Sequence, residues 1–310
     1  MFGRISSAGY VRQALNDITA TRETLVDLQR DISTGKQAQT YDQLSSQGKL
    51  ERVTYLETAL TQNDTYTRNT TIIKARVTQM SSEVDNLQNL ASDLRQLIVS
   101  ARNPVEGQVL PIKQLVFEKL QLIADALNSS MEGRHLFAGS KTNIVPVVVD
   151  ENGTNINDDG TPNNSYYRGN DTILKADVDN GVSMPYNVTA DNPAFQSLIA
   201  AAYKAMEVGD SGAVNASQRD VLLVQSLDLI NQSISQLQNV SSSVNSNLVV
   251  LQDLVDKHTD DGLFTISLLS DETDTDIVNT SIKESSYETV LQASFQVFAR
   301  LSKLTLSDYL

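Results

Sequence analysis

The sequence is poor in the residues that build disulfide-stabilised or metal-dependent proteins. Its 310 residues include no cysteine and no tryptophan and only two histidines, and aromatic residues amount to 5%. The absence of cysteine excludes disulfide bonds and thiolate metal sites, and it suits a chain that is exported unfolded. The few aromatic residues favour slender helical packing through Leu, Ile, Val and Ala over a wide globular core.

Long apolar runs and positive charge are also scarce. No run of about 18 apolar residues is present, so no membrane-spanning helix is expected. The residues from Met1 to Ser6 lack the apolar core of a signal peptide, so no cleaved signal is expected. The formal net charge of −14 disfavours a nucleic acid or an anionic membrane as partner, because both attract clusters of Lys and Arg.

A phosphate-binding motif is present only in part. Ser33, Thr34, Gly35 and Lys36 match the end of a phosphate-binding loop, but Arg30 occupies the position of the first glycine of that loop. Gly35 is therefore predicted to cap the end of a helix, with Lys36 facing the negative end of the helix dipole.

Metal-binding and catalytic motifs are incomplete as well. The stretch Asp150 to Thr161 resembles a calcium-binding loop, yet its sixth position is Asn155 instead of Gly, and its twelfth is Thr161 instead of Glu. His135 and His258 belong to no His-Glu-x-x-His motif, and both are expected at solvated helix ends. The sequence therefore predicts no catalytic residue, no cofactor and no metal site, and the chain is not expected to be an enzyme.

Heptad spacing of apolar residues is abundant, first at the two ends of the chain. The N-terminal series consists of Val11, Ile18, Leu25 and Ile32. The C-terminal series, in a segment without Gly or Pro, consists of Tyr287, Leu291, Phe298, Leu301 and Leu304. Each series forms a narrow seam along one helix face, which must pack on the other helix, on the rest of the chain or on neighbouring copies. We therefore predict that these residues form an assembly interface.

Two longer heptad series occupy the middle of the chain. One runs from Leu56 to Ile98, with Asn63 and Thr70 as polar members, and the other runs from Leu223 to Val255. Polar residues on such a seam reduce stability but can fix the register between packed helices. Both series predict long helices that pack along their length.

Proline and glycine indicate where helices begin and end. Asn103-Pro104 is predicted to end the first long helix, because the residue before proline avoids the α conformation. Asp260 to Gly262 is predicted to end the second long helix. Shorter helices are expected over residues 112–127 and from Pro193, which is a favourable first-turn residue.

Residues 141–192, between the two helical halves, are rich in Asn, Asp, Gly and Thr and lack helical periodicity. Short apolar runs alternate there with turn signals, which predicts a small β-rich insertion exposed to solvent. The expected fold is mainly α: long antiparallel helices from both chain halves form a coiled-coil stalk, and the small β-rich domain is inserted between them. The expected segments are terminal helices over 1–48 and 271–310, the stalk over 49–140 and 193–270, and the surface insert over 141–192.

Several motifs carry a family resemblance. The stretch Gln29 to Lys36 resembles the signature of the flagellin superfamily in its hook-associated form. The stretch Gly133 to Thr142, which contains Arg134, Phe137 and Gly139, is similar to the motif that ends the inner helical region of type 3 hook-associated proteins, which form the hook–filament junction. The same family is matched by two further stretches, residues 167–170 and 293–310.

The resemblance implies that the terminal helices form an inner coiled-coil tube around a channel, with the long helices in the next layer and the insert projecting outward. It implies secretion through the flagellar export apparatus and an extracellular place in the bacterial flagellum, at the hook–filament junction. The implied partners are the first hook-associated protein, flagellin and further copies of the chain, with an export chaperone as an additional partner. The family's Asp-Asp-Pro after Ser-Thr-Gly-Lys is missing here, which leaves open the neighbour contacts of that loop.

Two other functions fit parts of the sequence. A flagellin that forms the filament itself would have the same architecture. An enzyme or ligand-binding module within the insert is a third interpretation, which the lack of His and Cys in residues 141–192 disfavours. We therefore expect a structural subunit that joins the hook to the filament.

Overall fold

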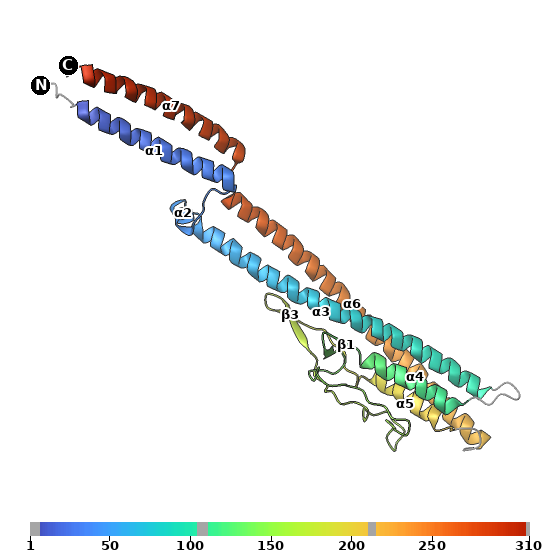
Figure 1. Cartoon of the computed structure of the whole chain (residues 1–310). Coiled ribbons are helices and arrows are strands. Elements are labelled where there is room, and N and C mark those ends of the chain that lie inside the picture. Colours follow the sequence, from blue (N-terminus) through green and yellow to red (C-terminus); the bar gives the residue numbers. More distant parts are fainter. Residues whose placement is uncertain (1–6, 104–110, 210–214, 308–310) are drawn as a thin grey trace. The chain divides into compact units, whose positions relative to one another are not determined.

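The computed structural model describes residues 7–103, 111–209 and 215–307, and it describes side chains for residues 9–103, 111–209 and 215–300. The described elements are long helices and two small antiparallel sheets (Figure 1). The chain divides into two compact units, with cuts after Gln62 and after Asp260. We call the part before the first cut, together with the part after the second, the terminal unit, and residues 63–260 the central unit.

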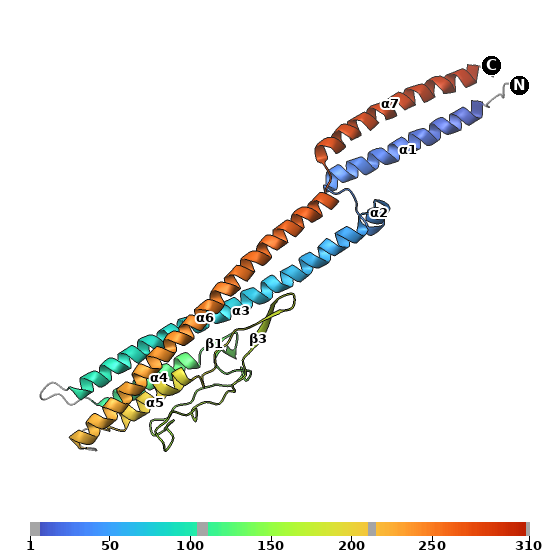
Figure 2. The same ribbon diagram turned by 180° about the vertical axis from the view of Figure 1, so that it is seen from behind.

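The terminal unit is built from the helices at the two ends of the chain. It contains α1 (Ser7–Thr34), α2 (Tyr41–Ser46) and α7 (Ile277–Ser307), with the beginning of α3 (Leu50–Arg102) and the end of α6 (Ala216–Thr273). α1 and α7 contact each other and lie side by side in both views (Figures 1 and 2). The two terminal helices therefore pack against each other.

The central unit is organised around α3 and α6, which run antiparallel. The Asn63 side chain donates to the carbonyl oxygen of His258 (2.6 Å), and at the other end the Arg219 side chain donates to the carbonyl oxygen of Ala101 (3.2 Å). The predicted heptad faces form the core, whose buried members include Val77, Val84, Leu87, Leu94, Ile98, Leu223, Ile230, Leu237 and Leu251. The prediction of a mainly α fold with long antiparallel helices is confirmed.

Two shorter helices complete the helical part of the central unit. α4 (Ile112–Leu127) and α5 (Pro193–Met206) pack on each other. α5 begins at Pro193 as predicted, and the side chain of Asn192 caps it by accepting a hydrogen bond from the Ala194 amide (3.0 Å). The burial of nearly every side chain of α5 places it inside the core.

The β structure of the described residues consists of two hairpins and three isolated bridges. β1 (Ser130–Met131) pairs with β2 (Arg134–His135), and β3 (Lys175–Asp179) pairs with β4 (Val182–Pro185). Only β3 and β4 belong to the insert, and the rest of it is turns, loops and isolated bridges, but the insert is not simply a solvated module. Several of its side chains belong to the same hydrophobic core as α3 to α6, namely Val147, Tyr166, Ala176, Val178 and Tyr186.

The structure corrects the predicted end of the second long helix. α6 continues through Gly262 to Thr273, so the prediction that Asp260 to Gly262 ends the helix is wrong. A helical glycine costs only about 1 kcal/mol relative to alanine, and Gly262 is buried, where packing outweighs this cost. His258 consequently lies within α6 and is 2% exposed, and His135 lies in β2. The expectation that both cap solvated helix ends is therefore also wrong.

Candidate assembly interface

The α1–α7 pair contains the heptad residues predicted at the chain ends. On α1, Ile18 is buried and the other members of the series are half-buried, namely Val11, Leu25 and Ile32. On α7, Leu291 and Phe298 are half-buried. Because the two helices contact each other, the structure brings both series together in one helix pair.

The rest of the α7 series is more open or lies beyond the described side chains. Tyr287 is 38% exposed. Leu301 and Leu304 are part of α7, but their side chains fall outside the described residues. The assembly role of both heptad series stays a prediction.

Polar residues extend the α7 face toward its N-terminal end. Thr280 is 8% exposed, and Glu284 accepts a hydrogen bond from the Gln29 side chain of α1 (3.1 Å). Positions 280, 284, 287 and 291 follow the four-three spacing of a heptad face. A search for apolar residues alone missed Thr280 and Glu284, whereas the spacing itself could have found them.

Many apolar side chains of this helix pair remain exposed to solvent. On α1, Tyr10 is 57% and Val26 is 54% exposed. On α7 the exposed apolar residues include Ile277, Val278, Ile282, Val290, Phe295 and Val297. Extensive exposed apolar surface in soluble proteins often marks an interaction site. The helix pair therefore has apolar surface available for further copies or other partners.

The motif Ser33 to Lys36 ends α1 and turns the chain away from the helix pair. Gly35 has a φ of +70° and its amide donates to the carbonyl oxygen of Asp31 (2.9 Å), which confirms the predicted helix cap. The Thr34 hydroxyl donates to the carbonyl oxygen of Arg30 (2.9 Å), while Ser33 is exposed. The sequence Ser-Thr-Gly-Lys thus has a conformational role here, because only glycine adopts this φ without strain.

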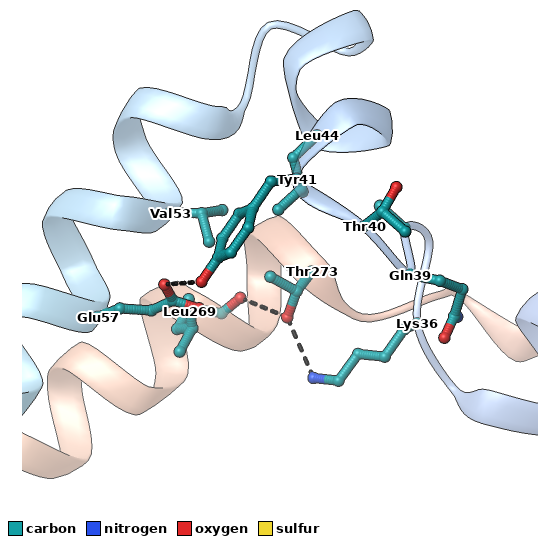
Figure 3. A pocket seen from close by; sticks show the side chains of 10 residues that line it. Lys36, Gln39, Thr40, Tyr41, Leu44, Val53, Glu57, Leu269 and Thr273 are labelled. Atoms are coloured by element: carbon teal, nitrogen blue, oxygen red, sulfur yellow. Dashed lines mark hydrogen bonds between the residues drawn. The ribbon is translucent and has the colours of Figure 1, made fainter.

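Lys36 follows α1 and lies beside the short segment that links α6 to α7. Lys36 and Asp274 form an antiparallel β-bridge, and the Thr275 amide donates to the carbonyl oxygen of Gly35 (2.9 Å). The Lys36 ammonium donates to the Thr273 hydroxyl (3.1 Å; Figure 3) and forms an ion pair with the Asp274 carboxylate. The hydrogen bond from Lys36 holds the pKa of the Asp274 carboxyl below its ordinary value. These contacts therefore hold the C-terminal end of α1 close to the N-terminal end of α7.

A second ionic contact joins α3 to α6 next to this bridge. Arg52 Nε lies 3.1 Å from one carboxylate oxygen of Glu272, and Lys49 Nζ lies 3.8 Å from the other. The Glu272 side chain is 17% exposed, and Lys49 also donates to its carbonyl oxygen (3.0 Å). This cluster fixes the end of α6 against the start of α3 within the terminal unit.

The second family-like motif begins with the turn between β1 and β2. Glu132 has a φ of +53° and Gly133 a φ of +74°. Positive φ at both central residues is typical of the two-residue turns that close hairpins. Arg134, directly after the turn, is exposed. The motif therefore starts with a tight turn.

The same motif then enters the core of the central unit. Phe137 is fully buried and packs edge-to-face on Phe195, with ring centroids 5.9 Å apart. Gly139, with a φ of +67°, lies against Asn170, whose side chain accepts from the Ser140 amide (2.7 Å). The Tyr167 hydroxyl donates to the carbonyl oxygen of Asn170 (2.7 Å). The structure thus brings the motif at 133–142 into contact with the motif at 167–170.

The residue types that bind metals are scattered in the part of the chain with described side chains. That part contains no group of three His, Cys, Asp or Glu side chains placed to hold a metal ion. The imidazoles of His135 and His258 each bond to a backbone carbonyl oxygen, that of Asn128 and that of Val178 respectively, both at 2.7 Å. None of the helices in the described ranges is long and apolar enough to cross a membrane.

The fold of this chain is similar to the folds of several solved flagellar proteins. FlgL from Bacillus cereus matches with a TM-score of 0.55 and 15% identity, over 69% of this chain and 98% of that chain. Flagellar hook-associated protein 3 from Legionella pneumophila matches with a TM-score of 0.57 and 12% identity, over 71% and 98%. FlgL from Xanthomonas campestris matches with a TM-score of 0.52 and 11% identity, over 69% and 98%. No protein-family model and no curated protein sequence matches the chain.

Proposed function

We propose that this chain is a structural subunit of the bacterial flagellum that joins the hook to the flagellin filament. The observation that carries the proposal is the α1–α7 pair, in which Ile18 is buried and Phe298 half-buried while large apolar side chains such as Val278 and Ile282 stay 70% and 63% exposed. Neighbouring subunits would bury these side chains, so completion of the terminal helices is coupled to assembly. The shared fold with solved hook-associated proteins supports this role.

The proposal includes partners, location and a division of the chain. The partners are the first hook-associated protein, flagellin, further copies of the chain and an export chaperone. The chain is secreted through the flagellar export apparatus and resides outside the cell at the hook–filament junction. The terminal segments 1–48 and 271–310 line the inner tube, the segments 49–140 and 193–270 form the stalk, and 141–192 faces outward. The role is structural and involves no catalysis.

A flagellin that forms the filament is the second candidate function. The same helices and the same exposed apolar residues suit a filament subunit equally well. The matched structures reported above are hook-associated proteins, which favours the junction. Abundance separates the two, because a filament subunit dominates a preparation of flagella and a junction subunit is a trace component.

Deletion of the gene in the source bacterium tests the proposal. We expect cells with hooks but no filaments in electron micrographs, and flagellin lost into the medium. Restoration of filaments by the complete chain is the control. Intact filaments in the deletion strain would contradict a junction role.

Complementation with Phe298→Asp then tests the terminal helices. A carboxylate buried without a partner in the assembled tube is strongly unfavourable, so we expect a secreted chain that fails to restore filaments. Phe298→Leu is the matched control, because it keeps an apolar side chain at the same half-buried position of α7. Full motility of the Phe298→Asp strain would argue against burial of this face in the assembly.

A further inference from the structure

The turn between β3 and β4 consists of an asparagine followed by a glycine. Asn180 and Gly181 lie between Asp179 and Val182, which are paired across the hairpin. Gly181 has a φ of +71°, a conformation that favours glycine. An asparagine side chain reacts spontaneously with the backbone amide of the next residue, and glycine permits this reaction best because it has no Cβ to obstruct the approach. The turn is therefore a candidate for covalent modification.

Both groups that take part in this reaction are accessible at the turn. Asn180 and Gly181 are exposed. Within the described part of the chain, the Asn180 side chain makes no hydrogen bond and the Gly181 amide donates to no acceptor. A Cβ added at Gly181 would meet no atom within 4 Å, so the surroundings leave room for the side chain to approach the amide. No interaction has to break before the two groups meet.

The other Asn-Gly pair of the sequence, Asn152 and Gly153, is held in place. The Gly153 amide donates to the carbonyl oxygen of Asp150 (3.0 Å), and the side-chain oxygen of Asn152 accepts from the Lys113 ammonium (3.4 Å). Gly153 also lies against Tyr203, whose hydroxyl would be 2.8 Å from an added Cβ. The two pairs are alike in sequence, but in the structure only the pair in the hairpin turn has both reacting groups free.

We propose that Asn180 is a site of spontaneous deamidation and that the folded structure protects Asn152 from it. The Gly181 nitrogen attacks Cγ of Asn180, and the new N–Cγ bond closes a cyclic imide. The bond from Cγ to Nδ2 breaks, and the side-chain nitrogen leaves as ammonia with the proton that the Gly181 nitrogen has given up to solvent. Water then opens the imide at either of its carbonyl groups, which leaves aspartate or isoaspartate at position 180. Water is the only reactant that the chain does not supply.

The two products affect the hairpin differently. Both place a new carboxylate next to Asp179, which forms an ion pair with Lys257 of α6. Isoaspartate also directs the backbone through the former side chain, which adds a methylene carbon between positions 180 and 181. Because the turn fixes the pairing of Asp179 with Val182, the added carbon disturbs the register of the hairpin. We expect isoaspartate to loosen the hairpin and aspartate to leave its backbone intact.

Peptide mapping of the full-length protein by mass spectrometry tests the proposal. The purified chain is incubated at mildly alkaline pH, where the Gly181 nitrogen loses its proton more readily, once folded and once in concentrated urea. In the folded chain we expect position 180 to deamidate at least about tenfold faster than position 152, a difference of about 1.4 kcal/mol in activation free energy. In urea both positions should react at similar rates, because the contacts that protect Asn152 are lost.

Substitution of each asparagine by serine gives a matched pair of variants. Serine keeps a short polar side chain that suits a turn, but it has no amide to lose. The main acidic band that forms on isoelectric focusing of the folded chain should persist in Asn152→Ser and disappear in Asn180→Ser. Asn180→Asp carries the new charge without the added backbone carbon, so faster amide hydrogen exchange in residues 175–185 should appear only in the incubated natural chain.

Three results would overturn the proposal. Equal rates at positions 152 and 180 in the folded chain would mean that the contacts of Gly153 give no protection. A folded chain unmodified at position 180, alongside reaction in urea, would mean that the hairpin turn itself prevents ring closure. An acidic band that persists in Asn180→Ser would assign the modification to another residue. None of these measurements involves assembly, so their outcome is independent of the proposed role in the flagellum.

Discussion

Gly139 is the residue whose replacement the structure restricts most clearly. A Cβ at this position would lie 2.1 Å from the carbonyl oxygen of Asn170 and 2.2 Å from its side-chain oxygen, and the φ is +67°. The left-handed conformation costs a residue with a Cβ about 1–2 kcal/mol, and the overlap requires the backbone at Asn170 to move. We expect Gly139→Ala to lower the free energy of unfolding of the central unit by about 3 kcal/mol or more, measured by urea denaturation.

Gly133→Ala is the matched control for this change. Gly133 has a similar φ of +74°, but a Cβ there meets no atom within 4 Å. The control therefore carries the conformational cost alone, about 1–2 kcal/mol. Equal destabilisation by the two substitutions would mean that the contact with Asn170 does not matter.

Tyr167 gives the central unit a dependence on alkaline pH. Burial, with the nearby Asp191 carboxylate, raises its pKa to about 12 from 10.0. Because the folded pKa is the higher one, the stabilisation is fully present below pH 10 and is lost as the pH rises toward about 12. We expect the difference in stability between the natural chain and Tyr167→Phe to shrink over this range, in urea titrations at fixed pH. A difference independent of pH would contradict ionisation of Tyr167 as its cause.

At the scale of the element, the heptad faces were the most predictable feature. Every third or fourth residue from Leu56 to Ile98 was placed on one face from spacing alone, and the structure buries that face, including the polar Thr70. Long helices are predictable in this way because one period is repeated many times. The helix cap at Gly35 and the start of α5 at Pro193 were also predictable, because they depend on local chemistry.

The failures came from interactions between distant segments. Gly262 was interpreted as a helix end, since its local cost is visible in the sequence and the packing that outweighs it is not. The insert was expected to be solvated because of its polar composition, yet Val147 and Val178 are buried in the core. Spacing within one helix gives no information on such contacts.

The hairpin of β3 and β4 is attached to the long helices by His258. The imidazole Nε2 donates to the carbonyl oxygen of Val178 (2.7 Å), and its ring stacks on Tyr66 with centroids 5.8 Å apart. His258→Phe keeps an aromatic ring but removes this hydrogen bond to the carbonyl of the buried Val178, which keeps a long contact to the Thr70 hydroxyl (3.5 Å). We expect a loss of about 1–3 kcal/mol and faster amide hydrogen exchange in residues 175–185.

Lys257→Met is the control for this substitution. Lys257 forms an ion pair with Asp179 of the same hairpin, but its side chain is 54% exposed. Exposed ion pairs contribute about 0–1 kcal/mol, so the hairpin should keep its protection from exchange. If both variants exchanged alike, the anchoring of the hairpin could not be assigned to the buried imidazole.

At the scale of the whole molecule, the insert is a part of the helical core and not an appendage. Val147, Tyr166, Val178 and Tyr186 are each at most 7% exposed and lie in one cluster with the residues of α3 to α6. The Tyr166 hydroxyl also donates to the carbonyl oxygen of Ala190, just before α5 (2.7 Å). Growth of loops at the surface of the insert is compatible with this arrangement, whereas removal of the whole insert is not.

Deletion of residues 145–186 should therefore unfold the central unit. Full burial of each large apolar side chain contributes about 1.5–3 kcal/mol, and several are lost together from a domain whose net stability is about 5–15 kcal/mol. We expect calorimetry to show no cooperative transition of the central unit in this variant. Replacement of residues 157–161 by two glycines is the control, because these residues are exposed and their flanks, Ile156 and Pro162, already form a bridge. The shortened loop should keep the transition near its natural temperature, and an unchanged transition in the full deletion would mean that the helices of the central unit form a sufficient core without the insert.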